Sequence, residues 1–233
     1  SSFGAEQALT EYFTTELNTK KESFLIVLTQ RGEKLASNLK LLLQTPDFQT
    51  AVDDAYFNQD TFAIKKYAND LKRTITIHNT YLLDASGKLL FSSDPNIKDV
   101  NTFKNKNYVI SGNRAIQHQL SYYGDKLVYV ACSKVTTPQG FSGYCIVEDD
   151  IILDEISDNF ARMLNAEITT YHNDLRIGAS SGSTLDGTGK RVTGTQLEDK
   201  SVLDTVYTEG KEAVGTLQIG KKNYFVIKTM TSV

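Results

Sequence analysis

The sequence predicts an α+β protein in which a long N-terminal helix precedes two tandem units, each an antiparallel sheet flanked by helices. Two observations support this fold class. The chain begins with 45 residues of helical periodicity and meets its first proline only at Pro46. Strand-like runs then follow in the order hairpin, helix, meander, and this order recurs in the second half with one closing strand fewer, which is typical of a repeated unit.

The first element is a helix over residues 1–45, called the stalk below. Apolar side chains recur along it at three- and four-residue steps, which places them on one side of a helix. These are Leu9, Phe13, Leu17, Phe24, Leu28, Leu35, Leu39 and Leu42. A helix of this length would measure roughly 65 Å, whereas globular helices usually run about 8–20 residues. The alternative is two helices broken near Gly32, because glycine weakens a helix interior by about 1 kcal/mol.

Residues 46–150 are predicted to form the first unit. One or two short helices within residues 46–72 precede strands at 75–83 and 88–92, which the turn Asp84-Ala85-Ser86-Gly87 joins. A short helix at 101–110 and strands at 113–121, 126–135 and 141–148 follow. A turn centred on Pro138 and Gln139, where proline presets φ, joins the last two strands.

Residues 151–165 are predicted to form a connecting helix, and residues 166–233 a second unit. This unit contains a hairpin of strands 166–171 and 175–180, a Gly/Ser/Thr-rich loop at 182–194 and a helix at 199–208. A second hairpin pairs strands 213–219 and 224–230. We interpret the unit as lacking or having lost its last strand.

Composition excludes several classes of protein. Apolar residues make up 40% and charged residues 23% of the chain, which is ordinary for a globular protein. The net charge of -3 and the lack of a basic patch argue against nucleic-acid binding. No apolar run is long enough for a membrane helix and no signal peptide is present. The abrupt start and end of the sequence instead predict a fragment flanked by membrane helices in its parent protein.

No catalytic or metal site is evident from the sequence, and no cofactor is expected. Gly178-Ala179-Ser180-Ser181-Gly182 matches the serine motif of α/β-hydrolases, but the histidine that should follow the serine is missing. The scattered histidines and cysteines do not form ligand pairs at metal spacing. Asp149 and Asp150 are interpreted as acids at the start of the following helix.

The two cysteines, Cys132 and Cys145, lie in neighbouring predicted strands. The Pro138-Gln139 turn would place them opposite each other, where a cross-strand disulfide is geometrically possible. Such a bond would fit an oxidising compartment. The alternative is two small buried thiols, and the sequence leaves both readings open.

The same register predicts a binding face on the first sheet. Arg114, His118, Tyr129, Ser133 and Tyr144 fall on one side of the predicted strands. Aromatic walls with a cation and hydroxyl groups are the usual lining of a small-ligand site, and arginine would bind a carboxylate. Tyr81 and Tyr108 could close this site. The alternative is that the tyrosines are core residues and Arg114 caps the sheet edge.

The other face of this sheet is predicted to pack on the stalk. It carries Val128, Val130, Cys132, Cys145 and Val147. A register slip of one residue would invert both assignments, because strand side chains alternate between faces.

The chain resembles the extracytoplasmic double Cache sensor domains of bacterial chemoreceptors and sensor histidine kinases, whose units are PAS-like. The strongest stretch is in the second unit, where Lys190-Arg191-Val192-Thr193-Gly194-Thr195 and Gly210-Lys211 match a loop and a turn common in the family. Ala166-Glu167-Ile168-Thr169-Thr170-Tyr171 and Arg176-Ile177 belong to the same stretch. In the first unit, residues 83–90 match a hairpin of PAS-like and Cache sheets. Family members usually end with a further strand that this sequence lacks.

The resemblance implies a periplasmic or extracellular domain of a cytoplasmic-membrane receptor, without catalytic activity. Such a domain binds a small molecule in its membrane-distal unit, here residues 46–150, and signals through the stalk, which would form a homodimer. A chemoreceptor and a ligand carrying a carboxylate, such as an amino or organic acid, are expected. The alternatives are the ectodomain of a histidine kinase or cyclic-dinucleotide enzyme, or an ectodomain that binds a protein instead of a ligand.

Overall fold

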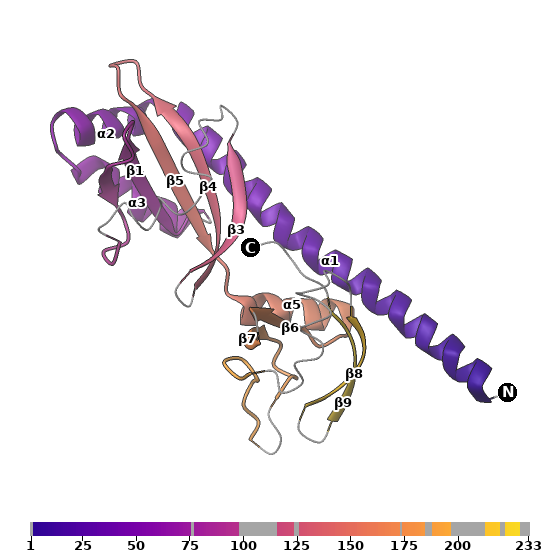
Figure 1. Cartoon of the computed structure of the whole chain (residues 1–233). Helices are drawn as coiled ribbons and strands as arrows, with labels where there is room; N and C mark the ends of the chain where they lie inside the picture. Colours follow the sequence, from indigo (N-terminus) through magenta and orange to yellow (C-terminus); the bar gives the residue numbers. More distant parts are fainter. Residues whose placement is uncertain are drawn as a thin grey trace. The chain divides into compact units, whose positions relative to one another are not determined.

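The computed structural model describes residues 2–75, 77–97, 116–123, 126–172, 174–184, 188–196, 213–219 and 222–228. The chain divides into two compact units. The large-sheet unit comprises residues 28–151, and the hairpin unit comprises residues 1–27 with 152–232. Figure 1 shows the elements of both units.

The first helix, α1, runs without a break over Ser2–Gln44, 43 residues in all. The alternative of two helices broken at Gly32 is therefore wrong. Most of the predicted apolar stripe is buried where its side chains are described, as for Leu28, Leu35, Leu39 and Leu42. Leu9 and Phe13 lie outside the described side chains. None of the helices within the described residues is long and apolar enough to cross a membrane.

Two short helices follow, as predicted. α2 spans Pro46–Phe57 and α3 spans Phe62–Thr74. Pro46 is at the start of α2, where its missing N–H costs nothing. The hydroxyl of Thr137 donates to the buried Asp53 carboxylate at 2.5 Å, which ties α2 to the turn between two strands of the sheet.

A five-stranded antiparallel sheet forms the centre of this unit, with the order β2-β1-β5-β4-β3. Its strands are β1 Asn79–Asp84, β2 Leu89–Ser92, β3 Gln117–Tyr123, β4 Lys126–Thr136 and β5 Ser142–Asp150. All five were predicted, although β1 begins later because Ile75 still caps α3 through its N–H to the Leu71 carbonyl. The predicted helix at 101–110 lies outside the described residues.

The register between β3 and β4 is as predicted, with Leu120 opposite Tyr129. The predicted register between β4 and β5 is wrong by one residue, since Cys132 pairs with Ile146 and Ser133 with Cys145. The turn between them has three residues instead of two. Gly140 adopts a φ of +101°, and the Thr137 N–H bonds the Phe141 carbonyl at 3.0 Å. A third loop residue in this left-handed conformation is a common hairpin geometry and shifts the pairing by one position.

The hairpin unit contains α5 Leu153–Leu164, which corresponds to the predicted connecting helix. Its described strands form two hairpins, β6 Thr169–His172 with β7 Leu175–Ala179, and β8 Ala213–Ile219 with β9 Lys222–Lys228. Asn165 ends α5 with a φ of +49°, a conformation that asparagine tolerates well. Phe24 of α1 packs edge-on against Phe160 of α5, with ring centroids 5.0 Å apart. The predicted helix at 199–208 lies outside the described residues.

Candidate ligand-binding site

The five-stranded sheet has two faces with different roles. One face packs against α1 and is called the helix face. Gly32 of α1 lies so close to it that a Cβ there would be 2.6 Å from the ring of Tyr129 and 2.7 Å from Nδ1 of His118. The opposite face, which points away from α1, is called the open-side face. Figure 1 shows α1 running along the sheet.

An ion pair also joins the helix face to α1. The Arg31 guanidinium donates to both carboxylate oxygens of Asp149, from Nε at 3.0 Å and from Nη2 at 2.8 Å. The Asp149 side chain is only 1% exposed. The structure therefore corrects the interpretation of Asp149 and Asp150 as acids at a helix start, because both lie in β5.

Three of the predicted ligand residues lie on the helix face. His118 is paired with Ala131, Tyr129 with Leu120, and Ser133 with Cys145. Tyr129 is 7% exposed, and burial raises the pKa of its hydroxyl although a hydrogen bond with Thr29 of α1 opposes the shift. Tyr129 thus packs as a core residue between sheet and helix.

The other two predicted ligand residues that the structure describes, Tyr81 and Tyr144, lie on the open-side face. Tyr81 of β1 pairs with Ile146 of β5, and Tyr144 pairs with Leu83. The one-residue shift in the turn is what moves Tyr144 away from His118 and Tyr129, because adjacent strand residues point to opposite sides. The predicted single face is therefore wrong. Tyr108 and Arg114 lie outside the described residues.

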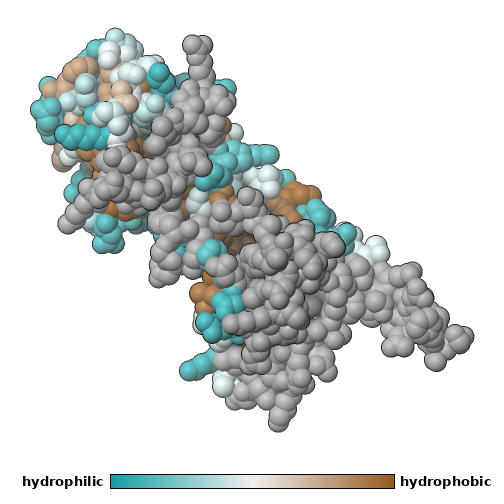
Figure 2. Space-filling model, viewed as in Figure 1, coloured by the Kyte–Doolittle hydropathy of each residue, from teal (hydrophilic) through white to brown (hydrophobic). Residues whose placement is uncertain are grey.

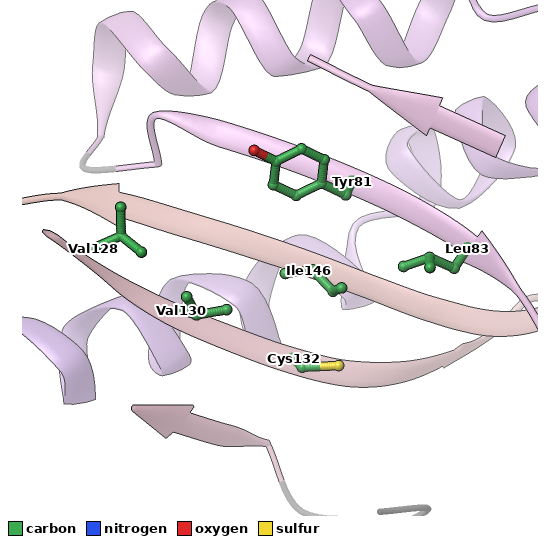
Figure 3. Close-up of a cluster of buried hydrophobic side chains, with 6 residues drawn as sticks. All are labelled: Tyr81, Leu83, Val128, Val130, Cys132 and Ile146. Carbon is green, nitrogen blue, oxygen red and sulfur yellow. The ribbon is translucent and has the colours of Figure 1, made fainter. Parts of the chain in front are cut away.

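The open-side face carries a compact apolar cluster. It consists of Tyr81, Leu83, Val128, Val130, Cys132 and Ile146, with the partly buried Leu89, Ile97 and Tyr144 packed against it. Figure 3 shows these six buried side chains projecting from β1, β4 and β5. The predicted packing of Val128, Val130 and Cys132 on the stalk is corrected by the same register, since they lie on the face away from Gly32.

A buried carboxylate closes one end of this cluster. Glu148 of β5 is fully buried, and the hydroxyl of Tyr81 donates to its Oε1 at 2.6 Å. The Asn79 amide lies 3.3 Å from both Glu148 and Asp150. Flipped, the amide instead donates to the His78 carbonyl at 3.1 Å and accepts from Lys126 at 3.0 Å, and these shorter bonds favour the flipped orientation.

The sequence reasoning missed Glu148. A buried glutamate is unusual unless it is hydrogen-bonded, so its position beside apolar groups marks a polar end of the cluster. The available signal was the run Glu148-Asp149-Asp150, in which three acids follow an apolar strand. Glu148 is two residues after Ile146, and side chains of a strand alternate between its faces, so both lie on the same face of β5.

The two cysteines are free and buried. Cys132 lies on the open-side face and Cys145 on the helix face, so their side chains project to opposite sides of the sheet. Burial raises the pKa of the Cys132 thiol to about 12 and raises that of Cys145 as well. Of the two readings left open by the sequence, the structure has buried thiols.

In the hairpin unit, the Lys190–Thr195 loop is held against α5. The Arg191 guanidinium donates to Asp158 at 3.1 Å and to the Ala179 carbonyl at 2.8 Å. The Thr193 hydroxyl donates to Asp154 at 2.7 Å. The pKa of the Asp158 carboxyl is lowered, mainly by the hydrogen bond from the Ser181 N–H and less by the hydrogen bond and charge of Arg191. These contacts give the loop a structural role.

Ser180, the serine of the hydrolase-like motif, also has structural partners. It is fully buried, donates to the Glu167 carboxylate and accepts from the Ile168 N–H. A nucleophilic serine would need exposure and an adjacent base. Among the described residues, no group of three or more potential ligands is placed to hold a metal ion.

Comparison with solved structures identifies the fold. The sensory domain of the Campylobacter jejuni chemoreceptor Tlp3 (CcmL) matches with a TM-score of 0.55 and 12% identity, covering 95% of this chain and 88% of that one. The same domain with isoleucine bound gives 0.52 at 13% identity, covering 95% and 87%. The ligand-binding domain of Tlp3 with L-norvaline gives 0.55 at 12% identity, covering 93% and 85%.

No protein-family model matches the sequence, and no curated protein matches it. The identities to the solved structures are low, so the similarity establishes the fold alone. The predicted α+β class is confirmed, and the resemblance to extracytoplasmic sensor domains is confirmed at the level of fold.

Proposed function

We propose that this chain is the extracytoplasmic small-molecule sensing domain of a transmembrane receptor of the chemotaxis type. The observation that carries the proposal is the fold, which is shared with the Tlp3 sensory domain over 95% of the chain. The solved neighbours are sensor domains, which also supports the expectation that this domain senses and does not catalyse.

The ligand is proposed to bind on the open-side face of the five-stranded sheet. This location replaces the mixed face of the sequence prediction and keeps only Tyr81 and Tyr144 of its described residues. The apolar cluster offers a surface for an aliphatic group, and the Glu148 carboxylate at its end offers an acceptor for an ammonium group. A carboxylate can accept several hydrogen bonds, and an ammonium group would be one donor to Glu148 beside the Tyr81 hydroxyl.

An amino acid with an aliphatic side chain fits this chemistry best. Its ammonium group would bind Glu148 and its side chain would lie against the partly buried rim of Leu89, Ile97 and Tyr144. The solved complexes of Tlp3 with isoleucine and norvaline support an aliphatic amino acid.

In the receptor, residues 46–150 are proposed as the membrane-distal unit, residues 151–165 as a connecting helix, and residues 166–233 as the membrane-proximal unit. The stalk is proposed to form a parallel homodimer and to lead into flanking membrane helices. Ligand binding would shift a two-state equilibrium, and only a difference in affinity between the states could do so.

Thermal unfolding of the purified domain with a panel of amino acids and small organic acids tests this function. A compound that binds only the native state raises the melting temperature, by about 3–6 °C at tenfold its Kd. We expect at least one aliphatic amino acid to do so. Glu148→Gln should abolish that shift, because an amide cannot replace the negative charge.

Ser133→Ala is the matched control. Ser133 was predicted to touch the ligand but lies on the helix face, half-buried. The variant should keep the full ligand-induced shift. If Ser133→Ala lost the shift and Glu148→Gln kept it, the ligand would lie on the helix face, which would contradict the proposal.

A protein partner is the second candidate, favoured by exposed aromatic side chains near the turn between α2 and α3. Phe62 is 78% exposed, and Tyr56 and Phe57 are 39% and 46% exposed and stack edge-on at 4.9 Å. Figure 2 shows apolar and polar residues interspersed on the visible face of this unit. A panel in which no compound stabilises the domain would favour this candidate.

A further inference from the structure

Arg176 of β7 is a cation that is almost entirely buried in the hairpin unit. It is 5% exposed. Among the described residues, no carboxylate forms an ion pair with it. A buried charge is costly unless it is paired, so an arginine in this position calls for a counter-ion.

Among the described residues, the hydrogen bonds of Arg176 leave one edge of its guanidinium unused. Nη1 donates to the Thr195 hydroxyl at 2.9 Å and to the Gln196 carbonyl at 2.6 Å. Nε is buried without an acceptor. Both hydrogen bonds that the guanidinium makes with described residues come from Nη1. The Nε and Nη2 donors are parallel and form the edge that binds a carboxylate through two hydrogen bonds.

The local structure holds this edge in place. The N–H of Arg176 donates to the Thr195 carbonyl at 2.8 Å, and the Gly194 N–H donates to the Arg176 carbonyl at 2.7 Å. The guanidinium carbon lies 5.7 Å from the centre of the Tyr171 ring. With backbone, Nη1 and an adjacent ring fixed, little conformational entropy is lost when the free edge binds an anion.

Arg191, in the same unit, shows the contrast. Its side chain is 29% exposed, and its guanidinium is paired with the Asp158 carboxylate at 3.1 Å. Among the described residues, the more exposed arginine has an acidic partner, whereas the buried one uses only neutral acceptors.

We propose that the Nε–Nη2 edge of Arg176 is a binding site for a small carboxylate anion. The anion supplies the missing charge and accepts both unused hydrogen bonds. This site belongs to the hairpin unit and does not depend on the ligand site proposed for the large-sheet unit. The domain would therefore carry a second, separate binding site.

Acetate, the simplest carboxylate probe, tests the site. We expect the melting temperature of the whole domain to rise with acetate concentration relative to chloride at equal ionic strength, by about 3–6 °C at tenfold the Kd. Acetamide, which has the same shape without the charge, should have no effect. Equal stabilisation by acetate and chloride would overturn the proposal.

Two variants assign the effect. Arg176→Lys keeps the positive charge but loses the two-donor edge. The apparent affinity for acetate, taken from the rise in melting temperature, should therefore fall at least tenfold. Arg162→Lys is the control, because Arg162 is an exposed arginine of α5 that donates to Asn159. It should leave the acetate effect unchanged. An undiminished effect in Arg176→Lys would contradict the assignment.

If Arg176→Lys fails to fold, the wild-type domain still decides the question. Nuclear magnetic resonance of the arginine Nε–H groups should show one signal that shifts with acetate and saturates. That signal should be the one absent from a spectrum of Arg176→Gln or, failing that, the one most protected from solvent exchange. No saturable shift would overturn the proposal.

Discussion

Glu148 and Asp149 are adjacent on β5, and their carboxylates project to opposite faces of the sheet. Glu148 receives the Tyr81 hydroxyl at 2.6 Å on the open-side face. Asp149 is bound by Arg31 of α1 on the helix face. Two consecutive residues of β5 therefore contact the proposed ligand face and the stalk helix.

The pKa of Asp149 is raised above its usual value, because burial outweighs the opposing hydrogen bond and charge of Arg31. The Nδ1 of His78 lies 3.3 Å from the same carboxylate. It accepts the Asp150 N–H at 2.9 Å. Arg31, whose Nη2 lies 2.8 Å from the carboxylate, is the closer of the two side chains to Asp149.

Arg31→Ala should destabilise the large-sheet unit at pH 7 by about 3 kcal/mol, since it leaves a buried carboxylate unpaired. The deficit should shrink as the pH falls, because protonation of Asp149 removes the charge. The native state binds this proton more tightly than the unfolded state does. The contribution of Asp149 to stability therefore decreases as the pH rises from its unfolded pKa, near 3.8, to its raised native value.

Urea unfolding of wild type, Arg31→Ala and Arg31→Ala/Asp149→Asn at several pH values measures both effects. The double variant should recover most of the stability at pH 7 and lose the pH dependence of the deficit. An Arg31→Ala deficit that is the same at acid and neutral pH would show that Asp149 is not the cause.

Residue identities alone could predict that tyrosines of this sheet are important, but not which face each one occupies. Tyr144 and Tyr129 are both aromatic residues in central strands, and only the register separates them. Glu148 was missed although it ends the predicted strand 141–148, because nothing in its local sequence shows that it is buried. Its burial depends on contacts with β1, 67 residues earlier in the chain.

At the scale of elements, Gly32 explains how α1 lies against the sheet. In the sequence this glycine suggested a break, yet the helix continues through it. The missing side chain allows the rings of Tyr129 and His118 to approach the helix backbone. Glycine is thus used here for close packing and not for flexibility.

Gly32→Ala should destabilise the domain by about 1–3 kcal/mol, because the added Cβ would be 2.6 Å from the Tyr129 ring. This outcome opposes the helix propensity, which alone would favour alanine by about 1 kcal/mol. Ser37→Ala, at an exposed position of α1, is the control and should be neutral or slightly stabilising. A Gly32→Ala variant more stable than wild type would contradict the close packing.

In the β4–β5 hairpin, the sequence predicted the strands correctly but not the length of the turn between them. The strands were located to within two residues at each end, since their apolar runs are clear. The turn was assigned two residues instead of three, and Gly140, with its φ of +101°, was the signal that could have corrected it. This error of one residue inverted β5 relative to β4, so Tyr144 and Cys145 were each grouped with β4 residues of the opposite face.

At the scale of the molecule, local patterns predicted the α+β class, the long helix and the sequence of hairpins. They did not predict that β1 lies beside β5 in the order β2-β1-β5-β4-β3. That pairing depends on distant segments meeting, and it brings Tyr81 to Glu148. The proposed site therefore follows from topology, which periodicity alone does not contain.

The central claim is that a small ligand binds on the open-side face of the large sheet. The chain has no tryptophan, so Tyr144→Trp introduces a single fluorescent reporter at the rim of the apolar cluster. Tyr129→Trp, on the helix face, provides the matched control.

The decisive measurement is iodide quenching of these two variants, with and without the compound that most stabilises the wild-type domain. We predict that the compound shields the Tyr144→Trp reporter from iodide in a saturable way and changes the quenching of Tyr129→Trp little. A compound that stabilises the domain but leaves Tyr144→Trp fully quenchable would contradict the account.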